Sequence, residues 1–433
     1  MSEALQKDNV FQNRNFCLVF FGALVSELGA ILYSFAVSFY ILDISRSNAA
    51  LQGLYLALCG IAMLVLTPIG GVLGDRMSKA RIMYLCDYLK GSMILLGAVL
   101  LSLFPAAAEQ LVILFALGIL GNMVSGIFNP AAGALFPHIV REDQLQQANS
   151  YFTMKNALEN IFGILLAGIL YAAMPVRALF VLVGLCYIAS GISEMLIRYE
   201  FHPATDRLTL KLAAADMAEG FYYLRTKKAI LTLLIAALFI NFFFAPVTGN
   251  FLPFFVKTDL SAAGHYLLDN ILTPEQWSSV FTASFGVSSL LGAAVLSSRP
   301  QSDKCGRRVS LLLCETAAVM VCLTGCYYFF VDHGTQISYF LIAFSLGFFA
   351  IGILISNTNI PINTAIMRIV DRDKLSKVSS IISIGSQGMT PIAAVLAGII
   401  LNAFGSTALL AFCTLGFAVT AVILLFSPQI KEL

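Results

Sequence analysis

Long apolar runs, separated by short polar segments, follow one another along the whole chain. Each run is long enough for the roughly 20 residues with which an α-helix crosses a bilayer. The twelve runs are 16–42, 50–74, 81–104, 110–137, 147–173, 177–197, 229–256, 276–298, 309–331, 337–360, 377–403 and 406–427. Because backbone groups in lipid must be hydrogen-bonded internally, this pattern predicts an all-α integral membrane protein with twelve transmembrane helices.

The composition supports a membrane protein and excludes several other classes. Of 433 residues, 59% are hydrophobic and 12% are charged, and the mean hydropathy is +0.86. Soluble domains carry about 25% charged residues. A net charge of +2 gives no electrostatic case for binding nucleic acid. The first apolar run exceeds the ~7–15 residues of a signal-peptide core, so we expect a retained first helix.

The distribution of basic residues predicts the orientation of the chain in the membrane. If the N-terminus is cytoplasmic, 21 of the 26 Lys and Arg residues fall in inner segments and only three in outer loops. By the positive-inside rule, both termini are then cytoplasmic. We expect a multi-pass protein of the cell membrane, with a bacterial inner membrane as the setting.

An internal repeat divides the sequence into two halves. The stretch "GDRMSKARIMYLCD" aligns with "SDKCGRRVSLLLCE" at an offset of 228, and "HIVREDQL" aligns with "RIVDRDKL" at an offset of 230. The repeat predicts six-helix halves at 1–197 and 229–433, joined by a cytoplasmic linker with an amphipathic helix at 198–228. A six-plus-six duplication is the plan of secondary transporters, whose substrate cavity lies between the halves.

The loop between the second and third helices resembles the signature G-x-x-x-D-R-x-G-R-K of the major facilitator superfamily, and a second copy follows in the other half. The resemblance covers essentially the whole chain and implies the major facilitator fold. We expect both copies, with the aligned acids that follow them, to form a cytoplasmic gate. The expected gate residues are Gly71, Asp75, Arg76, Lys79, Asp87, Asp303, Lys304, Arg307, Arg308 and Glu315. Gly70, Gly71 and Gly74 are expected to let the second helix pack closely on the eleventh.

Within the superfamily, three stretches resemble the macrolide-efflux and enterobactin-exporter branch. They are "YLCDYLKG", "GIFNPAAGALFPHIVREDQLQQANS" and "GFYYLRTKK". That branch implies export of amphipathic or drug-like molecules, usually in exchange for protons. Drug antiporters often carry a Gly-Pro pair in the fifth helix. Here Ile164 follows Gly163, and a proline stands instead in the eleventh helix, as Pro391. The resemblance therefore suggests antiport without establishing it.

Charged residues inside spans are candidates for a functional site, because a central charge costs roughly 2.5–3.5 kcal/mol or more. Glu27 lies near the middle of the first span and could exchange a proton for a cationic substrate. Lys155 and Glu159 are spaced i, i+4 and share one face of the fifth helix. The alternative for all three is a structural hydrogen bond or ion pair between helices.

Polar amides within spans are candidates for lining a cavity. We select Asn241, Asn250 and Asn357, the first two because the seventh helix mirrors the first. The alternative is that these side chains join helices, as amides often do in membranes. Closely spaced Pro246, Gly249 and Pro253 predict a bend in the seventh helix.

Other chemistries find little support in the sequence. Most of the nine cysteines lie within apolar runs and the four histidines are scattered, so no metal site is expected. Neither HExxH nor GxSxG is present, which argues against an intramembrane enzyme. We expect a monomeric secondary transporter without cofactors, driven by the proton gradient and working by alternating access. The alternative is an uptake or lipid-moving carrier, such as a lysophospholipid flippase.

Overall fold

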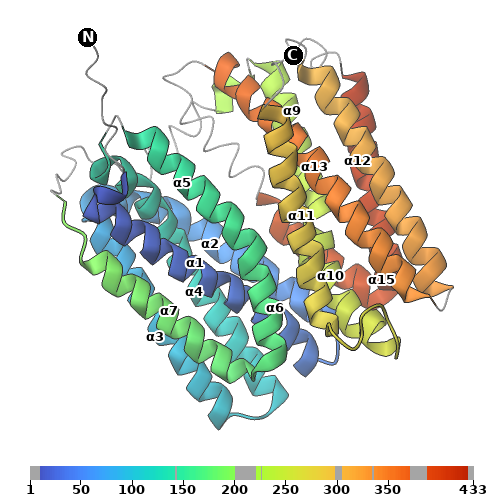
Figure 1. Ribbon diagram of the computed structural model, residues 1–433, viewed down its shortest axis with the longest axis horizontal. Coiled ribbons are helices and arrows are strands. Elements are labelled where there is room, and N and C mark those ends of the chain that lie inside the picture. Colours follow the sequence, from blue (N-terminus) through green and yellow to red (C-terminus); the bar gives the residue numbers. More distant parts are fainter. Residues whose placement is uncertain are drawn as a thin grey trace. The chain divides into compact units, whose positions relative to one another are not determined.

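The computed structural model confirms an all-α protein. It describes residues 10–141, 144–199, 221–225, 227–297, 305–333, 336–370 and 388–427. Within those ranges the chain is helical apart from short connections, and no strand occurs there (Figure 1). The expected linker helix lies mainly outside the described residues, although residues 221–225 are helical.

The first six predicted spans correspond to helices, and the fifth is interrupted by a wider π-helical turn. The chain runs through η1 (Val10–Gln12), α1 (Arg14–Ile44), α2 (Ala49–Arg76), α3 (Lys79–Leu103), α4 (Ala107–Ile139), α5 (Leu145–Leu158), η3 (Glu159–Gly163), α6 (Ile164–Ala173) and α7 (Val176–Met195). Here η3 is the π-helical segment, and α5, η3 and α6 together form the fifth span.

The later spans are also helical, with further π-helical turns. They comprise α9 (Lys228–Pro246), η4 (Val247–Phe251), α10 (Leu252–Phe255), η5 (Val256–Leu260), α11 (Pro274–Ser297), α12 (Cys305–Tyr327), η6 (Tyr328–Asp332), α13 (Ile337–Ile369) and α15 (Thr390–Phe426). The seventh span is irregular where the sequence predicts a bend, because the π-helices η4 and η5 follow Pro246 and Pro253.

Helix α15 accounts for two of the predicted spans. Its 37 residues would extend about 55 Å as a straight helix, far more than the ~30 Å hydrocarbon core. Gly405 breaks the helix with φ 81° and ψ −177°, a conformation that glycine adopts without a Cβ penalty. The eleventh and twelfth spans therefore meet at Gly405 with no intervening loop. Eleven continuous helical runs in the described residues are long and apolar enough to cross a membrane.

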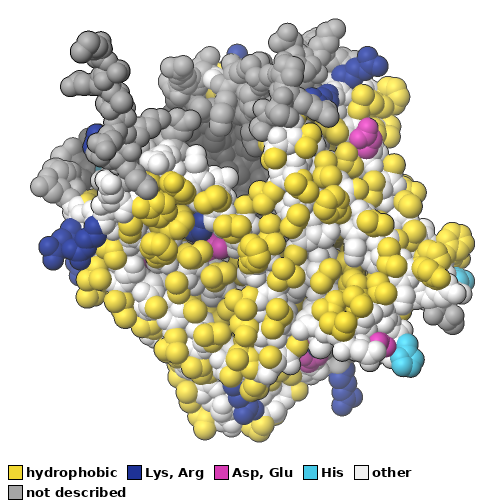
Figure 2. Space-filling model, in the orientation of Figure 1, with side chains coloured by type: hydrophobic (Ala, Val, Ile, Leu, Met, Phe, Trp, Pro, Cys, Tyr) yellow, Lys and Arg dark blue, Asp and Glu magenta, His cyan; other side chains and the backbone are white. Residues whose placement is uncertain are grey.

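The outer surface of the helices is apolar, as a lipid-facing surface should be. Large side chains such as Val112, Phe162 and Leu415 are more than half exposed. In the face shown in Figure 2, hydrophobic side chains cover most of the visible surface and charged ones are sparse. An exposed apolar area of this kind is suited to contact with the lipid of a bilayer and not with water.

The chain forms two compact units, which we describe separately. Unit 1 comprises Met1–Ser34, Ala62–Gly163 and Met174–Leu210. In it, α3 and α7 lie side by side (Figure 1). Their close approach depends on glycine, because a Cβ at Gly91 would come within 2.9 Å of the backbone oxygen of Gly184.

Unit 2 comprises Phe35–Ile61, Ile164–Ala173 and Lys211–Leu433. Three spans thus contribute a segment to each unit, and the division into two six-helix halves stays a prediction. The core of unit 2 is aromatic. Phe251 and Phe255 are fully buried and pack on Tyr327, Phe340 and Phe344. Packing therefore accounts for much of the phenylalanine-rich seventh span.

A seam of small residues joins α2 to α15 in unit 2. Cβ atoms added at Gly53 and Gly60 would collide with the backbone of Ala394 and the ring of Pro391. Gly398 of α15 makes the reciprocal contact with α2. We call Gly53, Gly60 and Gly398 the glycine seam. The second and eleventh spans do pack closely, as expected, but through glycines that the sequence analysis did not select.

The glycines selected for that contact lie elsewhere. Gly70 meets the backbone of α4 at Gly126 and Ile127, and Gly74 approaches Ala131 of the same helix. A Cβ at Gly71 would meet no atom of the described residues within 4 Å. Close packing of the second helix through Gly70 is therefore seen against α4. Packing of the trio on the eleventh helix stays a prediction, because residues 377–387 of that helix lie outside the described residues.

Candidate functional site

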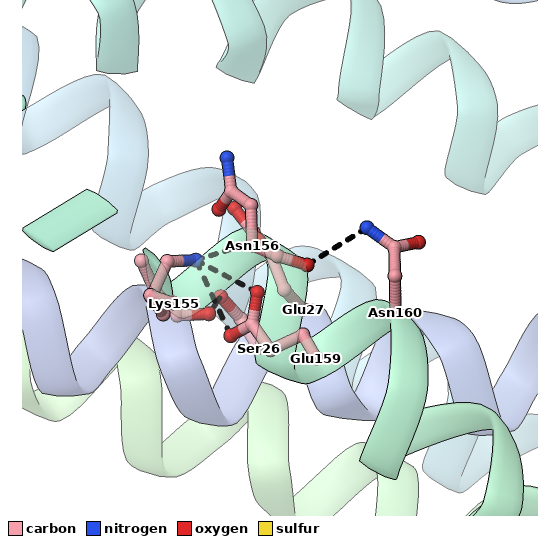
Figure 3. Close-up of polar contacts among 7 residues, drawn as sticks. Ser26, Glu27, Lys155, Asn156, Glu159 and Asn160 are labelled. Carbon is pink, nitrogen blue, oxygen red and sulfur yellow. Dashed lines mark hydrogen bonds and ion pairs between the residues drawn. The ribbon is translucent and has the colours of Figure 1, made fainter. Parts of the chain in front are cut away.

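A lysine and two glutamates from α1 and the fifth span meet inside unit 1. The Nζ atom of Lys155 lies 2.6 Å from Oε2 of Glu27 and 3.0 Å from Oε2 of Glu159. It also donates a hydrogen bond of 3.2 Å to Oε1 of Glu159. Figure 3 shows the ammonium between the two carboxylates. We call these three residues the Lys155 cluster.

The two acids of the Lys155 cluster differ in exposure. The side chain of Lys155 is 0% exposed and that of Glu159 is 3% exposed, whereas that of Glu27 is 51% exposed. Lys155 and Glu159 therefore form a buried pair, and Glu27 approaches the ammonium from accessible space.

Local structure brings these side chains together. The i, i+4 spacing of Lys155 and Glu159 places them on one helix face, and the π-helical turn η3 begins at Glu159. At the end of this turn, a Cβ at Gly163 would come within about 3.1 Å of Leu28 and Ile31 of α1. The glycine thus allows α1 to approach closely, which puts Glu27 within reach of Lys155. π-Helical turns of this kind are frequent at functional sites.

The charge of the Lys155 cluster is unbalanced. One ammonium faces two carboxylates, so the fully ionised cluster carries one net negative charge. Binding of one proton or one monovalent cation would neutralise it. Such neutralisation matters inside a membrane span, where uncompensated charge is costly.

Aromatic rings border the Lys155 cluster. Nζ of Lys155 lies 5.6 Å from the ring centre of Phe152. Phe152 packs edge-on against Phe16 and Phe20 of α1, with ring centres 6.0 and 5.5 Å apart. A carboxylate beside aromatic rings is the combination that binds organic cations with an apolar body.

A second lysine with two acids lies in unit 2. Nζ of Lys257 is 2.7 Å from Oδ1 of Asp43 and 2.7 Å from Oε1 of Glu275. The hydroxyl of Tyr171 donates a 2.6 Å hydrogen bond to Oδ2 of Asp43. We call these four residues the Lys257 cluster. It joins the end of α1 and the end of α6 to η5 and the start of α11.

Comparison with known proteins identifies the family. The sequence profile described as Major Facilitator Superfamily matches residues 19–300 and 266–432, which together span most of the chain. The chain belongs to the major facilitator superfamily. It is therefore a multi-pass membrane transporter and not an enzyme.

Two relatives within the superfamily come from Bacillus subtilis (strain 168). The MFS-type transporter YkuC is 25% identical over 300 residues, which are 66% of this chain and 65% of YkuC. The match thus spans slightly less than two thirds of YkuC. The MFS-type transporter YvqJ is 24% identical over 413 residues, covering 94% of this chain and 90% of its own length.

Solved structures of other transporters share the fold at low sequence identity. A bacterial homologue of the iron transporter ferroportin, in an inward-facing state, superimposes with a TM-score of 0.70 at 16% identity. That match covers 94% of this chain and 98% of the homologue. The nucleoside transporter NupG matches with a TM-score of 0.72 at 10% identity, covering 96% of this chain and all of the NupG chain. At these identities the likeness establishes the fold alone.

The first copy of the superfamily signature spans the last turns of α2 and the start of α3. Gly71, Asp75 and Arg76 lie in the last turns of α2. The side chain of Asp75 is not among those that the structure describes. Lys79 begins α3, where its backbone N–H donates a 2.6 Å hydrogen bond to the hydroxyl of Tyr199. Ser78 also donates to this hydroxyl, at 3.2 Å. Tyr199, which follows α7, therefore anchors the signature loop.

The second copy of the signature is only partly described. Asp303 and Lys304 lie outside the described residues, and Arg307 and Arg308 lie in the first turn of α12. The two acids that align in sequence have different environments. Glu315 is exposed on α12, whereas Asp87 is 1% exposed inside unit 1. Their shared role in a cytoplasmic gate stays a prediction.

The three selected amides form separate hydrogen bonds. Nδ2 of Asn250 is buried and donates a 3.2 Å hydrogen bond to the carbonyl of Ala394, so this side chain joins η4 to α15. Asn241 and Asn357 each donate to the carbonyl four residues earlier on their own helix, at 2.8 and 2.9 Å. Asn241 is exposed and Asn357 is half-buried.

Several charged residues that the fold gathers were not predicted from the sequence. They are Asp43, Glu194, Lys257 and Glu275. Their positions near helix ends were the available signal, but pairing across distant helices leaves no spacing pattern. Among the described residues, no group of three or more His, Cys, Asp or Glu side chains is arranged to hold a metal ion.

Proposed function

We propose that this transporter exports amphipathic or drug-like small molecules in exchange for protons, with Glu27 as the exchanging acid. The observation that carries this proposal is the Lys155 cluster. A fully buried lysine pairs with one buried acid and with one acid that is half exposed inside a span. A purely structural ion pair would need only one acid and no access to it.

Competition at Glu27 supplies the coupling. A carboxylate exposed within a span should face water rather than lipid, because a charge in hydrocarbon costs roughly 2.5–3.5 kcal/mol or more. Proton binding neutralises Glu27 and leaves Lys155 balanced by Glu159 alone. A cationic substrate can take the place of that proton beside Glu27. Since the two ligands exclude each other, loading one requires release of the other.

Lys155 and Glu159 hold the exchanging acid in place. Two contacts from Lys155 to the buried Glu159 fix the ammonium on one side, at 3.0 and 3.2 Å. Glu27 then meets a donor of fixed position. When Glu27 binds a proton, it no longer pairs with Lys155 as an anion, and this changes the balance of forces between α1 and the fifth span. In this proposal a local protonation thereby biases a movement of helices, which is the requirement for coupled transport.

The Lys257 cluster supports alternating access. Its four side chains tie segments of the first and fifth spans to segments of the seventh and eighth. By the distribution of basic residues, this end of the helices faces outward. We infer that the cluster closes the outer side in the present state and separates when the transporter opens outward.

The class of substrate follows from the surroundings of Glu27 and from the sequence. Phe152 lies against Lys155 and packs on Phe20, so aromatic rings adjoin the cluster that contains Glu27. Such a cluster suits a cation with an apolar body. The resemblance to the macrolide-efflux and enterobactin-exporter branch points to the same class. Aromatic walls tolerate varied shapes, so a range of substrates is expected.

Reconstitution tests the proposal. Purified protein is placed in liposomes with an imposed pH gradient, and movement of tetraphenylphosphonium, a macrolide, a catecholate siderophore and lysophosphatidylcholine is followed together with proton flux. We expect at least one amphipathic compound to move against its own concentration gradient while protons move in the opposite direction. Glu27→Gln should abolish uphill movement and its proton current, because the amide binds no proton.

The matched control is Glu109→Gln, an identical change at an exposed acid in the first turn of α4. It should transport like the unaltered protein. Uphill transport with normal proton flux in Glu27→Gln would exclude Glu27 as the coupling residue. Equal movement with and without a gradient would refute antiport, and movement of lysophosphatidylcholine alone would favour the lipid-moving alternative.

A further inference from the structure

A second acid inside unit 1 has no hydrogen-bond partner. Glu194, near the end of α7, is 0% exposed, and neither of its carboxyl oxygens accepts or donates a hydrogen bond within the described structure. Buried polar atoms are normally hydrogen-bonded, so an unpartnered carboxyl group requires an explanation. The Lys155 cluster does not include it.

Two charged side chains lie near Glu194. Asp87 and Lys90 of α3 lie within electrostatic range and are buried, at 1% and 8% exposure. Ser190, one turn earlier on α7, faces Asp87 without reaching normal hydrogen-bond geometry. We call Asp87, Lys90 and Glu194 the Lys90 cluster. Two further titratable groups adjoin it, Cys86 of α3 and Tyr187 of α7.

The position of Lys90 leaves Glu194 without a direct cationic contact. Its Nζ atom lies over two aromatic rings, 5.4 Å from the centre of Phe128 and 5.3 Å from that of Tyr187. Asp87 is its neighbour at i, i+3 on the same helix. One ammonium thus lies near two carboxyl groups, and among the described residues it forms an ion pair with neither, while Oδ2 of Asp87 also lacks a hydrogen-bond partner there. We assign the balancing negative charge to Asp87 because it shares a helix with Lys90, whereas both oxygens of Glu194 are unpartnered.

We propose that Glu194 is a second proton-binding site, loaded with one proton in this state and exchanged during transport. The loaded proton makes the Lys90 cluster electrically neutral, with Lys90 balanced by Asp87. It also lowers the cost of burying two carboxyl oxygens without a hydrogen-bond donor, because a neutral carboxyl group is less costly to bury than a carboxylate. The exchange step rests on the proposed proton-coupled function, whereas the loaded state does not.

Access to Glu194 requires a rearrangement of α3 and α7. These helices are in glycine contact at Gly91 and Gly184, and no surface of Glu194 is accessible. In the proposed function Glu27 exchanges its proton from accessible space. Glu194 would exchange its proton only when the two helices separate. The two acids would therefore load and release protons at different points of the transport cycle.

Infrared spectroscopy tests the loaded state without any substrate. Spectra of the purified protein and of Glu194→Gln, both at neutral pH, are subtracted to isolate the carboxyl group of Glu194. We expect a protonated carbonyl band in the unaltered protein that is missing from the variant and shifts in deuterium oxide. A difference spectrum with carboxylate bands instead would overturn the proposal.

Folding of the variants is informative in itself. Glutamine has the shape of a neutral glutamic acid, so Glu194→Gln should unfold at nearly the unaltered temperature. Asp87→Asn is the matched control at the neighbouring acid, and it should unfold at a lower temperature because Lys90 loses its counter-charge. If Glu194→Gln fails to fold or is the less stable of the two, Glu194 acts as a charged partner and the proposal is wrong.

Proton counting tests the exchange step. The number of protons moved per tetraphenylphosphonium is measured in liposomes from the pH gradient that halts net flux. We expect Glu194→Gln to move one proton fewer than the unaltered protein. An unchanged number in Glu194→Gln, with coupling lost in Glu27→Gln, would overturn the exchange at Glu194 while leaving the proposed function intact. Normal coupling in Glu27→Gln would count against the proposed function only.

Discussion

The Lys155 and Lys257 clusters contain the same charged groups, one ammonium and two carboxylates, but they are built differently. In the Lys155 cluster the lysine is fully buried, one acid comes from its own helix, and Glu27 is half exposed. In the Lys257 cluster both acids come from other helices, and Tyr171 adds a hydrogen bond to Asp43. The first arrangement leaves an acid available to a ligand, whereas the second uses its acids to hold four segments together. Composition alone does not distinguish these roles, but exposure and chain connectivity do.

Removing the buried lysine should have the largest effect. In Lys155→Met the two carboxylates would face each other without a counter-charge, and one of them is buried. We expect loss of uphill transport and a decrease of about 3 kcal/mol in the free energy of unfolding. Thermal unfolding in detergent and liposome transport measure the two effects. The double variant Lys155→Met, Glu159→Gln should regain part of the stability but no transport. Equal stability of the single and double variants would contradict the charge argument.

The same substitution in the other cluster should alter conformation more than coupling. Lys257→Met removes both ion pairs between the four joined segments. Because these groups are partly exposed, we expect a cost of about 1–2 kcal/mol, which is roughly a tenfold shift toward the outward-open state. A cysteine placed at buried Gln52, in a background without native cysteines, should react faster with an impermeant maleimide from outside. Unchanged reactivity would show that the Lys257 cluster does not close the outer side.

Removal of a single hydroxyl should have the smallest effect. Tyr171→Phe deletes the 2.6 Å hydrogen bond to Asp43 but retains the ring beside Lys257. We expect a cost of about 1 kcal/mol, roughly a fivefold increase in maleimide reactivity at the same cysteine. Tyr151→Phe, in unit 1, is the matched control and should leave this reactivity unchanged. A larger effect than that of Lys257→Met would place the strength of the cluster in the hydrogen bond rather than in the ion pairs.

The sequence predicted much of the fold because the bilayer imposes simple length and polarity rules. All twelve apolar runs correspond to helical segments, except that part of the eleventh lies outside the described residues. The absence of a loop between the last two spans was less visible. Only the backbone conformation of Gly405 separates them, and glycine is common within transmembrane helices.

The candidate site was predictable only where its residues share a helix. The spacing of Lys155 and Glu159 indicates their contact, but nothing in the sequence shows that Lys155 also reaches Glu27, 128 positions away. The same limit applies to the Lys257 cluster, which unites residues from four segments. Glu194 lacks even a spacing signal, because its charged neighbours lie on α3. Contacts between helices depend on packing geometry, which periodicity does not encode.

The glycine seam has a consequence for the speed of conformational change. Where side chains interdigitate, one helix can move past another only if several side chains change rotamer together, and each change adds to the activation barrier. At Gly53, Gly60 and Gly398 the close contacts are made by main-chain and proline-ring atoms, with no rotatable side chain on the glycine itself. We therefore expect relative rotation of α2 and α15 to need no rotamer exchange on the glycines at these points, so that the seam adds little to the kinetic barrier there.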